Sequence, residues 1–363
     1  MKWALLILYS GVASAQNPLA EAVARNNEAL DLFEHGRYTE AERLYRSALG
    51  AAYNDDLTRA KIANNLAVLY KREDRYSDAE RMFRSALQWR QRSLPEGSVE
   101  VAYSLNNLGD ILRIEGRDWE AGKLLEISVQ SLQQFHPDDP FLPLILSNLS
   151  SVRCWFGKFD DAEALVREAL ILYEKQKGAG SWEYGITINN LGRILQSKDE
   201  FKAADLLYAQ AISIFERLGA QGRSYLATTL SNVGVLYQQQ KQMEEARQAE
   251  QRALDLLGPT GDEPLRAIIL RNLGNLVACT GNAADSLRYF EKSLTIQETA
   301  LGGEHPMTAP LLLDYASAAM RAGDKSLSRK LTRRANELLN RLNHQSPEDL
   351  TVSVRALSEV SKP

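Results

Sequence analysis

The chain of 363 residues repeats itself about every 42 residues, and this period constrains its fold more than any other feature. Each unit carries a short motif of the kind Asn64-Asn65-Leu66-Ala67, and we take its second residue as the anchor. Asn27 and Asp314 extend the series to eight units. Periods of about 20–50 residues are typical of solenoids and arrays, so a division into separate globular domains is not expected. The six anchors within the motif are Asn65, Asn107, Asn148, Asn190, Asn232 and Asn272.

Each unit predicts two helices joined by a tight turn. In the second unit Leu66 and Tyr70 belong to the apolar stripe of a first helix, and Ala79, Phe83 and Ala86 to that of a second. Small residues fourteen and twenty-one positions after the anchor allow the helices to approach closely, and large residues eighteen positions after it fill the space between them. The turn residue stands nine positions after the anchor, at Gly36, Asp74, Gly116, Gly157, Asp199, Lys241, Gly281 and Gly323.

The predicted architecture is an all-α solenoid of about eight helical hairpins. The connections between hairpins are rich in Gly and Pro and too short for domain linkers, so each hairpin buries its faces against its neighbours. A tail of residues 343–363 follows, in which Leu350, Val352 and Val354 alternate with polar residues; it packs as a short extended cap or is disordered. The expected hairpins cover residues 22–52, 58–94, 100–135, 141–177, 183–218, 225–257, 265–301 and 307–342.

The repeat resembles the tetratricopeptide repeat, whose pattern of small and large residues matches Leu66-Ala67, Tyr70, Ala79, Phe83 and Ala86. Its longer period and the connection Leu301-Gly302-Gly303-Glu304-His305-Pro306 are similar to the kinesin-light-chain type of this repeat. The resemblance covers residues 22–342. It implies a right-handed superhelix of paired helices, in which the first helices line a concave groove that holds a peptide of a partner.

The resemblance places the anchor Asn residues on that groove. An Asn amide offers two donors and an acceptor, so the row Asn65, Asn107, Asn148, Asn190, Asn232 and Asn272 could pair with the backbone of an extended peptide. The alternative is a structural ladder that joins adjacent helices, and both interpretations stay open. The row is broken at Asp314 in the last unit.

Cationic side chains lie on the same helices, at one-turn offsets from the anchors. Arg pairs well with carboxylates, which suggests an acidic peptide or the free carboxyl terminus of a partner as ligand. The alternative is that these charges are solvated or paired within the protein. The candidate binding cations are Lys61, Arg72, Arg193 and Arg271, with Arg321, Lys71 and Arg113 as further members of the set.

The last unit is strongly basic. A terminal repeat needs a polar outer face, so a solvated cap is one explanation. A docking patch for an acidic partner or an anionic lipid is the other. The cations concerned are Lys325, Arg329, Lys330, Arg333, Arg334 and Arg341.

Residues 1–15 have the three parts of a secretory signal peptide. Lys2 precedes a short apolar stretch, which ends in Ala13-Ser14-Ala15. This predicts export to the periplasm or out of the cell; the alternative is a capping helix in a cytoplasmic protein. Cys154 and Cys279 stand three repeats apart, too far for a disulfide bond, and are expected to be free thiols that are buried or line the groove.

The composition excludes several classes of activity. A net charge of −4 argues against a general nucleic-acid binder, and no apolar run approaches the roughly 18 residues of a membrane span. The four histidines, three of them in turns and connections, match no catalytic or metal-binding motif, and no phosphate-binding loop is present. We therefore expect no enzyme activity, cofactor or metal.

The function expected from the sequence is a non-catalytic scaffold or adaptor that binds a protein segment in its groove. One alternative is a structural component of a cell-envelope complex that packs through its convex face or its ends. The other is a regulatory module that works with a separate catalytic or DNA-binding chain.

Overall fold

A computed structural model describes residues 17–258, 262–303 and 308–343. These residues form sixteen α-helices and one short 3-10 helix, and no strand occurs within the described ranges. The predicted all-α repeat fold is therefore confirmed. The expected signal peptide, the His305-Pro306 connection and the tail from His344 onward lie outside the described residues.

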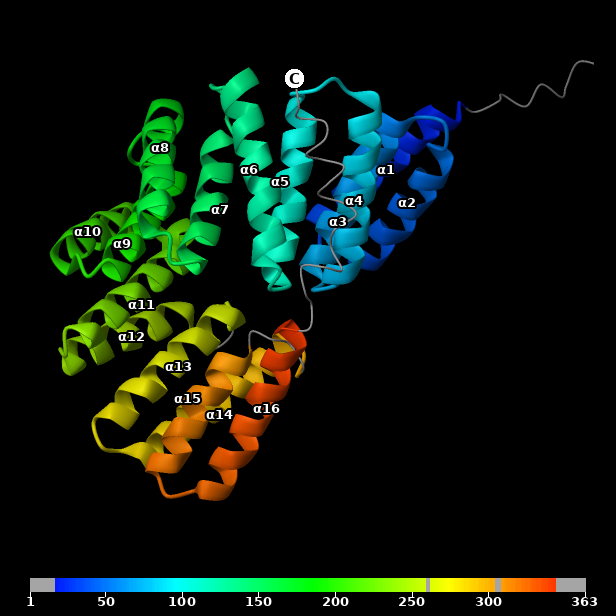
Figure 1. Ribbon diagram of the computed structural model, residues 1–363. Coiled ribbons are helices and arrows are strands. Elements are labelled where there is room, and N and C mark those ends of the chain that lie inside the picture. The colour runs from blue at the N-terminus through cyan, green and yellow to red at the C-terminus, as the bar shows by residue number, and fades with distance from the viewer. Residues whose placement is uncertain (1–16, 259–261, 304–307, 344–363) are drawn as a thin grey trace, which may run out of the picture. The chain divides into compact units, whose positions relative to one another are not determined.

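The chain divides into two compact units, residues 1–148 and 149–363, and α7 (Leu142–Trp155) contributes to both. In the first unit each first helix packs against the second helix that follows it, and the hairpins pack on one another in sequence order (Figure 1). Its other helices are α1 (Pro18–Glu34), α2 (Tyr38–Ala51), α3 (Asp56–Arg72), α4 (Tyr76–Ser93), α5 (Val99–Ile114) and α6 (Asp118–Phe135).

The second unit continues the same arrangement (Figure 1). A 3-10 helix at Gly219–Gly222 connects two of its hairpins. The helices are α8 (Phe159–Lys177), α9 (Trp182–Ser197), α10 (Phe201–Arg217), α11 (Arg223–Gln239), α12 (Met243–Leu257), α13 (Glu263–Cys279), α14 (Ala283–Leu301), α15 (Ala309–Arg321) and α16 (Lys325–Asn343).

The turn inside every hairpin has the same backbone conformation. The residue nine positions after the anchor has positive φ in all eight units, which reverses the backbone after the first helix. Glycine accepts this conformation freely, but Asp74, Asp199 and Lys241 adopt it at φ of 57°, 62° and 63°. The turn residue that recurs in the sequence therefore has a left-handed backbone conformation in every unit.

Alternation of small and large side chains builds the core. The Ala and Ser residues fourteen and twenty-one positions after the anchor are buried in all eight units. Tyr208, eighteen positions after its anchor, is fully buried and lies against Gly192 of the first helix, where a Cβ atom would come within 2.8 Å of the ring. The close approach of α9 and α10 therefore requires glycine at this position.

Both cysteines are free, as expected from their separation. Cys154 is half-buried, whereas Cys279 is exposed. Burial raises the pKa of the Cys154 thiol, although the nearby Arg193 opposes this. None of the described helices is long and apolar enough to cross a membrane.

Candidate interaction face of the first helices

The exposed side of the first helices lies opposite the core. In α3 the core residues Leu66 and Tyr70 follow the anchor by one and five positions. Lys61, Val68 and Arg72 stand at minus four, plus three and plus seven, which is one face of the helix, and all three are exposed. We call the exposed residues at these three positions of α1 and α3 the first-helix face; its members are Val23, Leu30, Glu34, Lys61, Val68 and Arg72.

The anchor Asn residues of the first unit form a ladder between first helices. The side-chain Nδ2 of each anchor donates to the Oδ1 of the residue that precedes the anchor of the previous repeat. These rungs hold α1, α3, α5 and α7 in a fixed order, so they position the first-helix face. The three bonds are Asn65 to Asn26 at 3.1 Å, Asn107 to Asn64 at 3.0 Å and Asn148 to Asn106 at 2.8 Å.

The ladder recurs in the second unit. Asn232 of α11 donates to Asn189 of α9 at 3.0 Å. Asn272 of α13 donates to the Ser231 hydroxyl at 3.1 Å. Asn190 is half-buried, and its side chain has no hydrogen-bond partner among the described residues of this unit. Where the rungs form, the amide already has a partner within the protein, as in the structural interpretation of the row.

Asp314 completes the ladder rather than breaking it. Its Oδ2 accepts from Arg271 Nε at 2.6 Å and from Asn275 Nδ2 at 3.0 Å. Arg271 occupies the position before the anchor, where the other rungs have an Asn or Ser acceptor. The last rung therefore keeps its place but reverses its donor and acceptor.

The candidate cations differ in their surroundings. Lys61, Arg72 and Arg193 are exposed, and none of the described carboxylates lies within ion-pair distance of them. Arg72 has only a long contact of 3.5 Å to the Tyr38 hydroxyl. Arg271, by contrast, is held by Asp314. The structure thus leaves three of the four cations available to a ligand.

Lys71 and Arg113 are paired with one carboxylate between two first helices. Lys71 of α3 bonds Asp110 of α5, and Arg113 lies 3.3 Å from the other oxygen of Asp110. Lys71 thus connects α3 with α5, whereas Arg113 pairs with Asp110 within α5.

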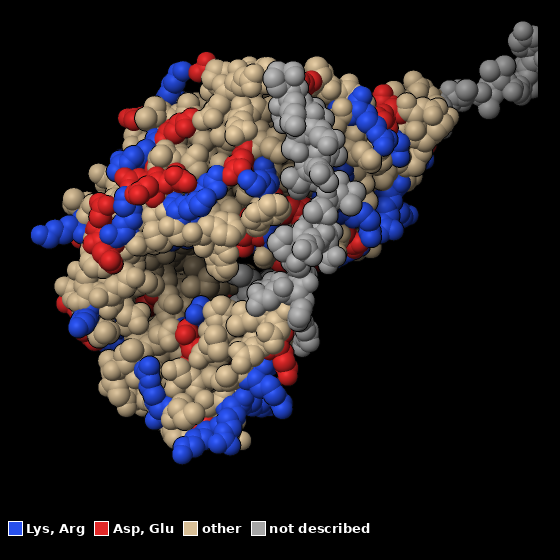
Figure 2. Space-filling view, in the orientation of Figure 1, with Lys and Arg blue, Asp and Glu red and all other residues tan. Residues whose placement is uncertain are grey.

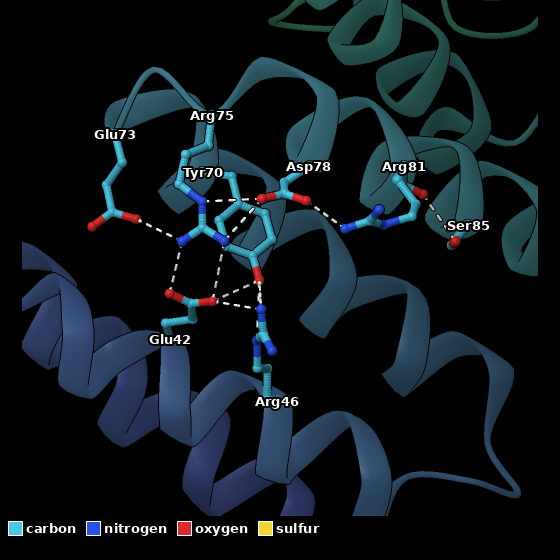
Figure 3. A network of polar contacts seen from close by, with 8 residues as sticks. All are labelled: Glu42, Arg46, Tyr70, Glu73, Arg75, Asp78, Arg81 and Ser85. Carbon is cyan, nitrogen blue, oxygen red and sulfur yellow. Dashed lines mark hydrogen bonds and ion pairs between the residues drawn. The ribbon is translucent and has the colours of Figure 1, made fainter.

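A second polar network joins the first two hairpins on the side of the second helices. Figure 3 shows the Arg75 guanidinium between carboxylates of two helices, 2.8 Å from Glu42 of α2 and 2.9 Å from Asp78 of α4. The same group lies over the Tyr70 ring, 4.1 Å from its centroid. Burial alone would raise the pKa of Glu42, but hydrogen bonds from Arg75 and Tyr70 outweigh burial and hold this pKa below its ordinary value.

The next repeat uses the same connection. Arg117, one period after Arg75, lies 2.7 Å from Glu80 of α4 and 2.5 Å from Glu120. Glu120 is 2% exposed, and Arg84 provides it with a second cation at 2.6 Å. These inter-repeat ion pairs fix the hairpins relative to one another.

Glu250 is a buried carboxyl that the repeat pattern did not predict. It stands eighteen positions after its anchor, where most repeats have an aromatic or aliphatic residue, and it is 0% exposed. Its Oε1 accepts from Asn272 at 2.8 Å, while its Oε2 has no hydrogen-bond partner among the described residues. Burial raises the pKa of Glu250 to about 8, although hydrogen bonds from Ser231 and Asn272 oppose the shift. The signal in the sequence was an acidic residue at a position where most repeats have an aromatic or aliphatic one.

In the described part of the chain no group of His, Cys, Asp or Glu could hold a metal ion.

The family model described as tetratricopeptide repeat matches residues 58–134, 141–217 and 265–341. A second model with the same description matches residues 226–257, and together the matches cover more than half of the sequence. The chain belongs to the tetratricopeptide repeat family. Tetratricopeptide repeat proteins are generally non-catalytic scaffolds with protein or peptide partners, and this describes the general class of the protein.

Solved structures share the fold of this tetratricopeptide repeat protein. The Rap protein complexed with Competence and Sporulation Factor has a TM-score of 0.62 and 13% identity, covering 91% of this chain and 100% of that one. A tetratricopeptide repeat protein from Parabacteroides merdae has a TM-score of 0.58 and 14% identity, covering 87% and 99%. BtubC (BKLC) from P. vanneervenii has a TM-score of 0.50 and 22% identity, covering 66% and 89%. Among curated proteins, none matches in sequence.

Proposed function

We propose that this tetratricopeptide repeat protein is a non-catalytic adaptor that binds an acidic peptide segment of a partner on the first-helix face. The observation that carries the proposal is the chemistry of this face. Val23, Leu30 and Val68 expose aliphatic side chains beside the unpaired cations Lys61 and Arg72. Glu34 is the single acidic residue of the face.

The chemistry of the face selects a peptide with two kinds of side group. Carboxylates of the ligand pair with Lys61 and Arg72, and Arg72 can do so with two parallel hydrogen bonds. Aliphatic groups of the ligand cover Leu30 and Val68. The Asn ladder holds α1 and α3 in register before the ligand arrives, so little ordering entropy is lost on binding.

A structural neighbour shows that this fold can hold a binding partner. The Rap protein, which has the same fold, was solved in complex with Competence and Sporulation Factor. At 13% identity the two proteins share the fold, but their binding residues cannot be equated. We therefore infer the acidic character of the ligand from Lys61 and Arg72 alone.

The test is a peptide selection followed by measurement of affinity. Displayed random peptides are selected on the protein, and the peptides obtained are labelled and titrated by fluorescence anisotropy. We expect enrichment of Asp and Glu beside aliphatic residues. The double variant Lys61→Glu/Arg72→Glu should bind the same peptides at least about tenfold more weakly, as is typical of central interface residues.

The matched control reverses two exposed cations of second helices, Arg43→Glu/Arg92→Glu. It changes the net charge equally and should leave the affinity within about twofold, because distant exposed charges are screened by salt. An equal loss of affinity in both variants would show that net charge alone causes the effect. Equal affinity in the parent protein and both variants would exclude the first-helix face as the binding site and favour an assembly role through other surfaces.

Export is a second part of the proposal and rests on residues 1–15 alone. Mass spectrometry of the protein purified from its host should find Gln16 at the N-terminus. An N-terminus at Met1 would favour the cytoplasmic alternative.

A further inference from the structure

The last helix, α16, differs from every preceding second helix at the surface where a further repeat would pack. Twenty-two positions after the anchor, seven repeats have an aliphatic residue and α16 has the exposed Asn336. Eighteen positions after the anchor, α14 has Phe290, whose ring stacks on Tyr315 of the next first helix at 5.7 Å between centroids. At this position α16 has Thr332. The aliphatic residues of the seven repeats are Leu49, Leu87, Val129, Leu170, Ile212, Leu254 and Leu294.

These two polar substitutions leave a shallow hollow of about 540 Å³ on the end of the second unit. Met320 of α15 provides its apolar wall. The polar lining comes from α16 and includes two cations and one carboxylate: Arg329, Arg333, Asn336, Glu337 and Asn340. A hydrophobic repeat would leave these polar groups unpaired and is a poor occupant. The hollow fits a segment that brings hydrogen-bond acceptors.

Cationic side chains surround the hollow. Figure 2 shows Lys and Arg gathered over α16, at the bottom of the view. None of the described carboxylates lies within ion-pair distance of Lys325, Arg329 or Lys330, and Arg333 has only Glu337 at 3.8 Å. The end face, defined as Met320, Lys325, Arg329, Lys330, Arg333 and Asn336, therefore carries nearly uncompensated positive charge.

This arrangement is not the one that would best stabilise a helix. Lys325, Arg329 and Arg333 follow one another at spacings of four, so like charges are neighbours along one side of α16. Lys325 also stands at the helix N-terminus, where the helix dipole disfavours a cation. A cap that served solubility alone would mix both signs of charge. The charges of α16 therefore point to a ligand.

We propose that the end face binds an acidic segment of a partner protein. Carboxylates of the segment pair with Arg329 and Arg333, the amides of Asn336 and Asn340 donate to its carbonyl groups, and one of its aliphatic residues packs on Met320. The hollow favours a protein segment over a membrane, because a flat lipid surface cannot fill it. This site lies on other helices than the first-helix face and does not depend on it.

The experiment uses the full-length protein and a fluorescein-labelled peptide of Glu residues with Leu at every fourth position. We expect binding that weakens with added salt, and a loss of at least about tenfold in Arg329→Glu/Arg333→Glu. The same peptide with Gln in place of Glu should not bind. Arg43→Glu/Arg92→Glu is the charge-matched control. Because the same peptide also fits the first-helix face, each titration is repeated in the Lys61→Glu/Arg72→Glu background, where the loss caused by Arg329→Glu/Arg333→Glu should persist.

Thermal unfolding of the same variants provides the second readout. Because Arg329 and Arg333 are both exposed, Arg329→Glu/Arg333→Glu should melt close to the temperature of the parent protein, as is usual for substitutions at the surface. Equal peptide affinity in this variant and the parent would overturn the proposal, as would equal binding of the Gln peptide. Binding to vesicles of phosphatidylglycerol, without binding of the Glu peptide, would assign the end face to a membrane and also overturn it.

Discussion

Arg271 donates to Asp314 at 2.6 Å, and this ion pair occupies the place of an Asn-Asn rung between neighbouring first helices. The two residues depart from the repeat pattern together, one at the position before the anchor and the other at the anchor itself. A single change would have left the Arg or the Asp without an oppositely charged partner.

The first prediction concerns this pair. Arg271→Asn and Asp314→Asn should each lower the free energy of unfolding, whereas the double variant restores an Asn-Asn rung and recovers most of the loss. Both side chains are about one-third exposed, so we expect a coupling energy of about 0.5–1 kcal/mol. Urea denaturation of the four proteins measures it. Strictly additive losses would show that the pair is not coupled.

The second prediction separates structure from binding in the Asn ladder. Asn107→Leu removes the donor to the Asn64 oxygen and leaves the Asn64 amide without its partner on α5. The free energy of unfolding should fall by about 1–3 kcal/mol, measured by urea denaturation. Affinity for peptides selected on the first-helix face should stay within about twofold under native conditions. Asn54→Leu, at an exposed turn, is the control and should change neither quantity.

The third prediction is a pH dependence caused by Glu250. Its pKa rises from 4.5 in the unfolded protein to about 8 in the folded one, so the folded state retains a proton that the unfolded state releases. The free energy of unfolding should therefore fall as the pH rises from about 4.5 to about 8. Since a tenfold change in an acid constant corresponds to about 1.4 kcal/mol, the loss is at most about 5 kcal/mol.

Glu250→Gln tests this dependence. Gln resembles the protonated carboxyl and does not titrate, so the variant should lose this component of the pH dependence and be more stable than the parent at pH 9. Glu245→Gln, at an exposed position of the same helix, should retain the slope of the parent. An unchanged slope in Glu250→Gln would assign the dependence to other groups.

The fourth prediction concerns the left-handed turn residues. Lys241 adopts φ of 63°, which costs a residue with a Cβ atom about 1 kcal/mol relative to glycine. Lys241→Gly should therefore raise the melting temperature, with the gain reduced by the greater freedom of glycine in the unfolded state. Lys292→Gly, in the middle of α14, should lower stability by about 1 kcal/mol. A decrease in both variants would contradict the conformational argument.

The fold could be predicted from the sequence because its determinants are local and repeated. Ala79, Phe83 and Ala86 show the spacing of one helix, and seven further copies show the same spacing. The partners of polar residues could not be predicted in this way. Asn65 looks the same in sequence whether its amide meets a ligand or Asn26, because the two helices are separated by about forty residues. Glu250 and Asp314 were visible only as departures from the pattern.

The candidate site illustrates the same limit. The positions of Lys61, Arg72 and Arg193 on the first helices predict available cations, and all three are exposed. Arg271 has the same kind of position but is paired. The difference depends on a single carboxylate one repeat away.

The ladder also has a direction. Every rung needs a partner at the position before the anchor, and α15 has Leu313 there, a residue whose side group can neither accept nor donate and is 39% exposed. A first helix added after α16, or the first helix of another copy, would find no rung to join on α15. Any helix that packs there would have to be held by apolar contact with this leucine, without the amide bond that joins the neighbouring first helices.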